Sequence, residues 1–591
     1  MNTRLPACVR ALAGPTIIAL TALLAITPEM VRGGSCGHDF DFHLVSWFDA
    51  HASWQQGVFY PHWAPSPNYE AGEPRFIFYP PFTWMLGAAL GFLFRWSDVS
   101  AAMTWLLLAG AGLATYALAR LAMARGPATI AGCFALISSY SLFNAYERTA
   151  FGELSGGIWI PLLLLFVLHD RNPHGSLPRR AFDGSTAGLA LAVAGAWFSD
   201  VPLGVMTCYL LAAVALASAF MRRSWAPVLR AATAVILGLG LTSVYLLPAI
   251  AQQKWVNVHE ATSDPGTRVE DSWLFAHHAD PAFAQHDAEL FRVSVVGFSL
   301  IAATLVCVWI AWRRKRLPGP PSVWAPLALI PAVVLILQLP ISLPVWDLLP
   351  KMHFLQFPWR WLITVQAPLG IFLASALWME KPTLRRLSFI GIGLAMVSLT
   401  LMECHFFFQA CYPEDTARAM QQNSAAHIGF EGTDEYAPEF ADNALVALNL
   451  PDACLTSSAT LTLGKSQGDD TPQWNKSQGS CLAIFPITHT GKPAAEHLHV
   501  DFEAPRAGFL IVRLRSYPAW RITLNGTAID HLPERGDGLI AVPVQAGRGS
   551  LRIAWSVSRV DMAARSLSSI FLLGLIAFFI AERKSASPHL S

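Results

Sequence analysis

Charged side chains are scarce in this chain of 591 residues, since Asp, Glu, Lys and Arg make up only 14% of it. Soluble proteins typically carry about 25% charged residues, so the composition excludes an ordinary soluble multidomain protein. The formal net charge is only +1, and the basic residues stand in short clusters rather than on one extended face. Nucleic-acid binding is therefore unsupported. The nine cysteines show no CxxC or zinc-ligand spacing.

Apolar residues, in contrast, make up 53% of the chain and give a mean hydropathy of +0.41. A helix needs about 20 apolar residues to cross the hydrocarbon core of a bilayer. Apolar runs lie near residues 11–28, 77–94, 100–119, 127–143, 156–169, 184–200, 202–220, 226–250, 291–312, 323–341, 359–379, 386–408 and 562–581. The sequence therefore predicts a polytopic α-helical membrane protein. Residues 27–32 form a poor cleavage site, so the first run is interpreted as a retained helix rather than a signal peptide.

The basic clusters indicate which apolar runs cross the membrane. If every run crossed, the loop with Arg120 and Arg125 would face outward, against the positive-inside rule. If the run 77–94 stays on the outer face as a juxtamembrane or re-entrant helix, all basic clusters lie inside: Arg120/Arg125, Arg179/Arg180, Arg222/Arg223, Arg313–Arg316, Lys381/Arg385/Arg386 and Arg583/Lys584. We therefore predict about twelve spanning helices, with both termini cytoplasmic.

Residues 409–561 differ in character from the rest of the chain. Polar residues become frequent, and segments such as 509–515 and 521–526 alternate between apolar and polar residues, with a tight-turn signal at Asn525-Gly526. The sequence predicts an extracytoplasmic β-sandwich between a membrane module (1–408) and a last helix with a cytoplasmic tail (562–591). Cys454 and Cys481 fall in it, and they could either pair in an oxidising compartment or remain separate thiols.

The first outer loop, residues 29–99, begins with two carboxylates and a histidine: Asp39, Asp41 and His43. Ionisable groups beside a membrane are costly to keep, which makes them candidates for function. One carboxylate could act as a general base toward an acceptor hydroxyl, or hold a divalent cation with His43. Alternatively, one acid caps a helix that starts near Phe42 while the other pairs with an arginine.

Aromatic residues crowd the same loop, among them Trp63 and Tyr79. Aromatic faces beside carboxylates suit a sugar ring, but aromatic residues are also ordinary anchors at a membrane surface.

Two arginines on the outer side break the charge bias. Arg148 lies near Glu153, and Arg360 begins a span between Trp359 and Trp361. Each could hold a lipid phosphate. The alternatives are a structural ion pair for Arg148 and simple snorkelling toward the interface for Arg360.

The sequence indicates no definite cofactor. His277, His278, Asp280 and His286 could bind a metal, but they lack the i, i+4 histidine pair of a helical site. A divalent cation at the Asp39 loop is the other option.

Several motifs in order resemble one family along nearly the whole chain. The motifs are Asp39 with His43, Gly57 before Tyr60-Pro61-x-Trp63, Gly72-x-Pro74, Phe78-Tyr79-Pro80-Pro81, Arg148 with Glu153, Phe357-Pro358-Trp359-Arg360, residues 432–438, and Tyr517-Pro518-Ala519-Trp520 with Asn525-Gly526. They resemble bacterial membrane proteins labelled 6-pyruvoyl-tetrahydropterin-synthase-related, kin of YfhO-type proteins. His62 stands where the family usually has arginine, which weakens a phosphate role there, and Ala519 replaces a glycine.

The resemblance implies the GT-C architecture of glycosyltransferases that use a polyprenyl-phosphate sugar, with catalytic acids in the first outer loop and outer arginines on the lipid phosphate. On this expectation Asp39, or failing it Asp41, deprotonates the acceptor, and Arg148 and Arg360 neutralise the leaving phosphate. His43 belongs to the catalytic group, and Glu153, His62, Trp63 and Tyr79 support the site. The β-domain would hold a glycan or protein acceptor at a bacterial inner membrane. The alternative is a non-catalytic transporter or scaffold for lipid-linked glycans.

Overall fold

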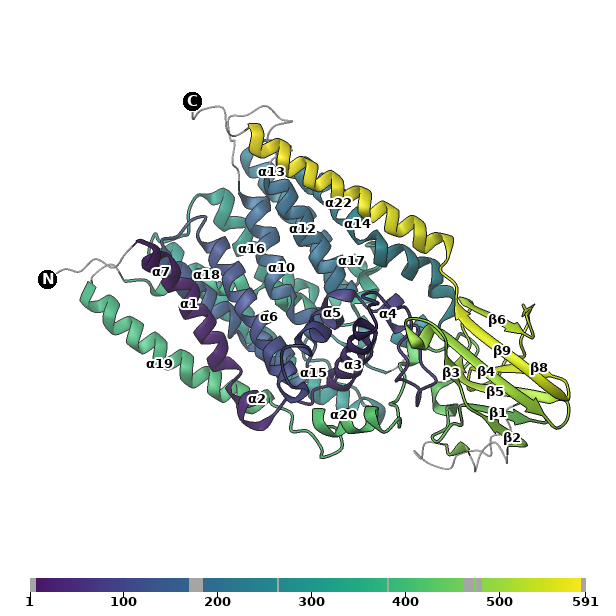
Figure 1. Ribbon diagram of the computed structural model, residues 1–591. Coiled ribbons are helices and arrows are strands. Elements are labelled where there is room, and N and C mark those ends of the chain that lie inside the picture. The colour runs from purple at the N-terminus through teal and green to yellow at the C-terminus, as the bar shows by residue number, and fades with distance from the viewer. Residues whose placement is uncertain are drawn as a thin grey trace.

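A computed structural model describes residues 7–169, 184–262, 265–379, 382–460, 472–474 and 481–585. The predicted inner cluster Arg179/Arg180 and Lys381 lie outside these ranges. Figure 1 shows a bundle of helices from which a β-domain projects at one end, with α19 beside α1 on one flank and α22 along α14 on the other.

Seven of the described helices are long and apolar enough to span a membrane, and three bent helix pairs raise the number to ten when each pair counts once. The predicted class of a helical membrane protein is therefore confirmed, whereas the number twelve stays a prediction. The helices of the membrane module are α1 (Ala7–Ala25), α2 (Thr27–Arg32), α3 (Phe40–Gln55), α4 (Arg75–Phe78), α5 (Pro81–Leu90), α6 (Trp96–Ala119), α7 (Arg125–Leu136), α8 (Ser139–Leu142), α9 (Phe151–Leu154), α10 (Gly156–Leu168), α12 (Gly184–Ser199), α13 (Val201–Arg222), α14 (Ala226–Gln252), α15 (Ala284–Arg313), α16 (Pro321–Leu337), α17 (Leu343–Leu348), α18 (Gln366–Leu377) and α19 (Pro382–Phe407).

Three predicted spans are broken rather than straight. The run 127–143 becomes α7 followed by α8 and a π-helical turn η1 (Phe143–Glu147), with a bend of 41°. The run 323–341 bends by 98° between α16 and the helices that follow, and 359–379 bends by 45° between the 3₁₀ helix η8 (Pro358–Thr364) and α18. Such breaks inside a membrane are tolerated where the freed backbone is buried in protein or lines a cavity. Two of them, η1 and η8, adjoin the arginines of the candidate site.

Helix α5 occupies the apolar run 77–94 but contains only 10 residues. At 1.5 Å per residue its length is about 15 Å, half of the hydrocarbon thickness. It is therefore too short to cross the bilayer, as expected for a juxtamembrane or re-entrant helix.

The C-terminal region contains the expected antiparallel sheets. One sheet has the order β2-β1-β5-β8 and the other the order β3-β4-β9-β6-β7. Along β4, the buried residues Leu498, Val500, Phe502 and Ala504 alternate with half-buried or exposed ones. The buried residues share one core with Leu455, Leu510 and Val542 of the facing sheet. The strands are β1 (Ala453–Thr456), β2 (Ala483–Phe485), β3 (Thr488–His489), β4 (His497–Ala504), β5 (Gly508–Arg515), β6 (Trp520–Leu524), β7 (Thr527–Ile529), β8 (Leu539–Val544) and β9 (Gly547–Trp555). Helix α20 (Ala417–Ala425) precedes the sheets and α22 (Arg559–Ser585) follows them.

Two disulfides cross-link the chain. Cys454 pairs with Cys481 inside the β-domain, so the first of the two sequence alternatives is confirmed. Cys36 pairs with Cys411 across 375 residues and ties the start of the first loop to the segment after α19. This second bond is not predictable from the sequence, because the spacing of distant cysteines does not reveal which of them lie close together.

We expect Cys481→Ser to lower the stability of the β-domain by about 3 kcal/mol, because the bond closes a 27-residue loop in the unfolded chain. Thermal unfolding in detergent measures the change. With dithiothreitol present, the wild type and the variant should unfold at the same temperature. Peptide mapping that finds both Cys454 and Cys481 alkylated in the unreduced protein would contradict the pairing.

Candidate functional site

The start of the first outer loop is held against the turn that carries Arg148. The backbone N–H of Asp39 donates to the Arg148 carbonyl at 3.0 Å, and that of Gly37 donates to Thr149 Oγ1 at 3.1 Å. A side chain at Gly37 would collide with Thr149 and the Glu147 carbonyl, so only glycine permits this close approach. The backbone pairing therefore fixes the position of Asp39 relative to Arg148.

Asp39 is the residue at the N-terminal cap of α3, which begins at Phe40, yet its side chain makes no capping hydrogen bond. In the part of the chain that the structure describes, its carboxylate also takes part in no ion pair. Burial raises its pKa, while the nearby Arg148, His38 and Arg360 act in the opposite direction. Asp39 is half-buried, whereas Asp41 is exposed in the first turn of α3. The helix-cap alternative is therefore wrong for Asp39.

Glu153 joins the two outer arginines. Its carboxylate lies 2.9 Å from Arg148 Nη1 and 3.5 Å from Arg360 Nε, and it also accepts hydrogen bonds from the Tyr140 hydroxyl and from Asn144 Nδ2. The Nε–H groups of both arginines are buried and have no hydrogen-bond acceptor among the described residues. Each of these Nε atoms lies near a carboxylate at a distance too long for a good hydrogen bond, Glu289 at 3.7 Å from Arg148 and Glu153 at 3.5 Å from Arg360.

Phe357 lies beneath both arginines. The guanidinium carbons of Arg148 and Arg360 are 5.5 and 5.2 Å from the centre of its ring. Arg360 therefore points into the protein toward Glu153 and does not snorkel to the membrane surface.

Three further residues complete this cluster, and the sequence had identified only one of them as a site residue. The Tyr79 hydroxyl is close to Gly152 and is electrostatically coupled to Asp39. Glu289, at the start of α15, lies 3.7 Å from Arg148 Nε. Asp200 caps α13 through the Leu203 N–H at 2.9 Å and interacts with Arg360. An acid at the entrance of an apolar run was the available signal for Glu289 and Asp200.

His43 is a buried aromatic-core residue. Its ring packs against Trp47, Tyr79 and Phe151 at centroid distances of 6.0, 5.8 and 5.1 Å. Neither ring nitrogen has a hydrogen-bond partner among the described residues. Burial lowers the pKa of His43 to about 3, with Arg75 acting in the same direction. The imidazole is therefore neutral at pH 7.

No metal centre forms among the described residues. Within those ranges, no three His, Cys, Asp or Glu side chains are arranged to hold an ion. His277 and His278 both lie 2.7 Å from Asp287, and His286 faces Ser272 and the Asp271 carbonyl. A divalent cation at the Asp39 loop or in the 277–286 segment therefore stays a prediction.

His62 and Trp63 attach the first outer loop to the β-domain. His62 Nδ1 lies 3.2 Å from the Glu496 carboxylate, and its Nε2 lies 3.0 Å from Arg565 Nη2 of α22. Trp63 packs against Trp520 at a centroid distance of 5.0 Å. These contacts hold the first outer loop on the β-domain, and the supporting role at the site expected for His62 and Trp63 stays a prediction.

A family model described as "6-pyruvoyl-tetrahydropterin synthase related domain; membrane protein" matches residues 76–410. The chain belongs to this family. The matched region contains Tyr79, Arg148, Glu153 and Arg360, while Asp39 lies before it. No curated protein matches the chain.

Solved structures similar to this family member are GT-C glycosyltransferases. The oligosaccharyltransferase of Archaeoglobus fulgidus is 11% identical, with a TM-score of 0.40 over 73% of this chain and 62% of that one. The arabinofuranosyltransferase AftD from mycobacteria is 18% identical, with a TM-score of 0.40 over 68% of this chain and 27% of that one. ArnT from Cupriavidus metallidurans, bound to undecaprenyl phosphate, is 14% identical, with a TM-score of 0.27 over 63% and 77%. The activity of this chain must be argued from its own site.

We expect Glu153→Gln to destabilise the protein by about 3–5 kcal/mol, because it leaves two buried guanidinium groups without their shared carboxylate. The matched control is Glu503→Gln, which removes an exposed carboxylate 3.2 Å from Arg548 and should cost at most about 1 kcal/mol. Thermal or denaturant unfolding in detergent compares the two. Equal stability losses would show that the Glu153 pairs carry no special weight.

The neutral His43 makes stability depend on pH. Because the unfolded histidine titrates at 6.5 and the folded one at about 3, the unfolded state takes up a proton first as the pH falls. The wild type should lose roughly 2 kcal/mol between pH 7 and pH 5 from this group alone. His43→Phe should remove that part of the loss, as measured by unfolding at both pH values. A variant with the same pH dependence as the wild type would refute a neutral, buried His43.

Proposed function

We propose that this protein is an inverting glycosyltransferase that moves a sugar from a polyprenyl-phosphate donor to an extracytoplasmic acceptor. The observation that carries the proposal is the carboxylate of Asp39. It has no capping or ion-pair partner among the described residues, and backbone hydrogen bonds hold it close to Arg148 and Arg360. A base for a hydroxyl and a cradle for a leaving phosphate are the two groups that this reaction needs.

Asp39 would act as the general base. It removes the proton from the acceptor hydroxyl while the acceptor oxygen bonds to the anomeric carbon of the donor sugar. The bond from that carbon to the phosphate oxygen breaks, and the electron pair leaves with the polyprenyl phosphate. Burial raises the pKa of Asp39, which brings it closer to the working pH and makes it a better proton acceptor than an exposed aspartate.

Arg148 and Arg360 would stabilise the charge that develops on the phosphate. Both side chains are nearly buried, where a charge-assisted hydrogen bond is stronger than in water. Their positions are set by Glu153, so they do not need to rearrange when the phosphate arrives. Glu153 is therefore a positioning residue rather than a participant in the transfer.

An apolar cavity supports a lipid-linked donor. Its volume is about 510 Å³, and it lies between α13 and α16, where Leu210, Val214, Ile330 and Val334 are among its lining residues. Trp361 and Thr364 of η8 close one side of it. Because Arg360 belongs to the same 3₁₀ helix, a polyprenyl chain in this cavity would have its phosphate near the arginine.

The disulfides support an extracytoplasmic site. Cys36–Cys411 adjoins Asp39, and Cys454–Cys481 lies in the β-domain. Disulfides persist in oxidising compartments and are rare in the bacterial cytoplasm. This observation agrees with the positive-inside assignment, which puts both termini on the cytoplasmic side of an inner membrane.

The test is sugar transfer from a radiolabelled polyprenyl-phosphate sugar by the purified full chain. Asp39→Asn should lower the rate by about 10²–10⁴-fold, because the amide cannot accept the proton. The matched variant Asp41→Asn, two residues away and exposed, should transfer at close to the parent rate. Transfer should also fall at acid pH as Asp39 becomes protonated, at a higher pH than for an ordinary aspartate. Full activity in Asp39→Asn would overturn the assignment, and donor binding without turnover in the wild type would identify a scaffold or transporter.

A further inference from the structure

We infer that a cleft between the β-domain and the outer end of α14 binds a neutral oligosaccharide, the acceptor of the reaction; this identification of the ligand as acceptor rests on the proposed function. The cleft has a volume of about 660 Å³ and lies apart from the Asp39 cluster. A volume of this size is typical of sites for small organic ligands.

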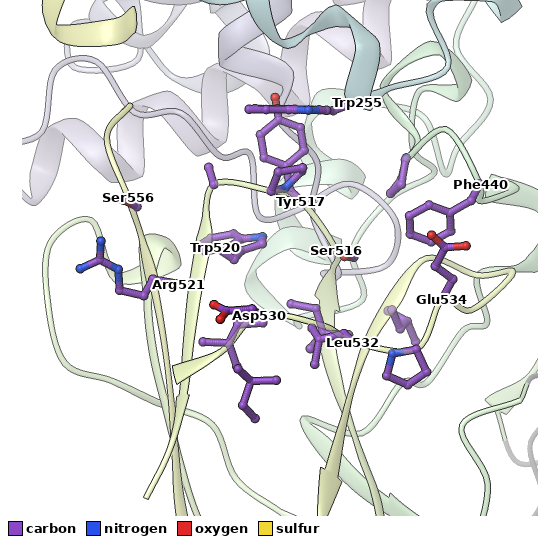
Figure 2. A pocket seen from close by; sticks show the side chains of 18 of the residues that line it. Trp255, Phe440, Ser516, Tyr517, Trp520, Arg521, Asp530, Leu532, Glu534 and Ser556 are labelled. Atoms are coloured by element: carbon purple, nitrogen blue, oxygen red, sulfur yellow. The ribbon is translucent and has the colours of Figure 1, made fainter. Parts of the chain in front are cut away.

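Aromatic rings form the walls of the cleft. Figure 2 shows Trp255 and Tyr517 at one end, Trp520 beside Asp530, and Phe440 opposite them. The polar atoms of two of these residues are already engaged, since the Tyr517 hydroxyl donates to Gln252 and Trp520 Nε1 donates to the Arg515 carbonyl. Both side chains are also buried, with 4% and 8% of their surface exposed, so they form the floor of the cleft. The ring surface that a ligand can reach belongs to the half-buried Trp255 and the exposed Phe440, and aromatic rings suit the C–H faces of a sugar.

Carboxylates stand at the rim. Asp530 and Glu534 are exposed, line the cleft together with Glu439, and take part in no ion pair among the described residues. Free carboxylates accept hydrogen bonds from sugar hydroxyls. Since Lys254 and Arg521 also line the cleft, the rim carries both signs of charge, which favours a neutral ligand with many hydroxyls over a strongly anionic one.

The same cleft is too polar at its rim to be a lipid site. Its position also differs from that of the apolar cavity between α13 and α16, whose lining residues are almost all apolar. The two cavities therefore suit the two halves of the reaction: a lipid tail in the membrane and a glycan outside it.

A short path of contacts joins the cleft to the candidate active site. Pro438 lines the cleft, and Tyr436, two residues before it, stacks on Phe78 at a centroid distance of 5.8 Å. Phe78 precedes Tyr79, which is coupled to Asp39, and the Phe78 carbonyl accepts a hydrogen bond from Tyr245 of α14 at 2.6 Å. An oligosaccharide bound in the cleft would thus be anchored on the same packed unit that carries the base.

The experiment measures binding separately from transfer. The full chain in lipid nanodiscs, wild type and Asp39→Asn, is applied to an array of neutral bacterial oligosaccharides and to an array of peptides. We expect at least one neutral oligosaccharide to bind both proteins. Two variants test the cleft: Trp255→Ala, and the double variant Asp530→Asn with Glu534→Gln. Each should weaken that binding by about tenfold, because the first loses a stacking contact and the second loses hydrogen bonds to sugar hydroxyls.

Controls separate the two hypotheses. Glu503→Gln, an exposed carboxylate of β4 outside the cleft, should bind the oligosaccharide as the wild type does. If the wild type shows no transferase activity but binds an oligosaccharide in the cleft, the binding site is supported and the proposed transferase function is refuted. If the cleft variants transfer sugar with the same KM for the acceptor as the wild type, the binding site is refuted and the transferase function is supported. The inference would also be overturned if no neutral oligosaccharide on the array bound to the protein, or if only peptides bound to the cleft.

Discussion

Glu153 forms ion pairs with Arg148 and Arg360, which lie more than 200 residues apart in the chain. The arrangement of the site depends on this one carboxylate. Arg148 follows the π-helical turn of one broken span, while Arg360 belongs to the 3₁₀ start of another. An unbroken α-helix at either place would direct the guanidinium elsewhere. The ion pairs thus explain why irregular backbone occurs here. The irregular turns bring two guanidinium groups to one buried carboxylate, and leaving a buried charge unpaired would be costly.

The candidate site residues that the structure brings together are those with a local signal in the sequence. Asp39, Tyr79, Arg148, Glu153 and Arg360 stood out as ionisable or aromatic residues at the ends of apolar runs, and the structure brings all five together. Hydropathy likewise located every helix that could span, and alternation located the β-domain. These properties depend on neighbours in sequence, which a single chain reveals.

Other features depend on partners far away in the chain. His43 has the sequence position of a catalytic residue, but the rings of Trp47, Tyr79 and Phe151 make its surroundings apolar. His62 and Trp63 belong to the same loop motif, yet their partners are Glu496, Trp520 and Arg565, more than 400 residues later. The motif of the first outer loop therefore contains residues of the candidate site and residues that hold the β-domain in place. Only the packing between the domains shows which residues belong to which group.

The Cys36–Cys411 bond has a consequence for biogenesis. Its two sulfur atoms cannot meet until the ribosome has made residue 411 and α19 has been inserted, by which time almost all of the membrane module exists. Until then, no disulfide through Cys36 joins the segment carrying Asp39 to the rest of the module. Oxidation of this pair is therefore a late step that follows the synthesis of most of the membrane module, and it requires an oxidant for the two thiols.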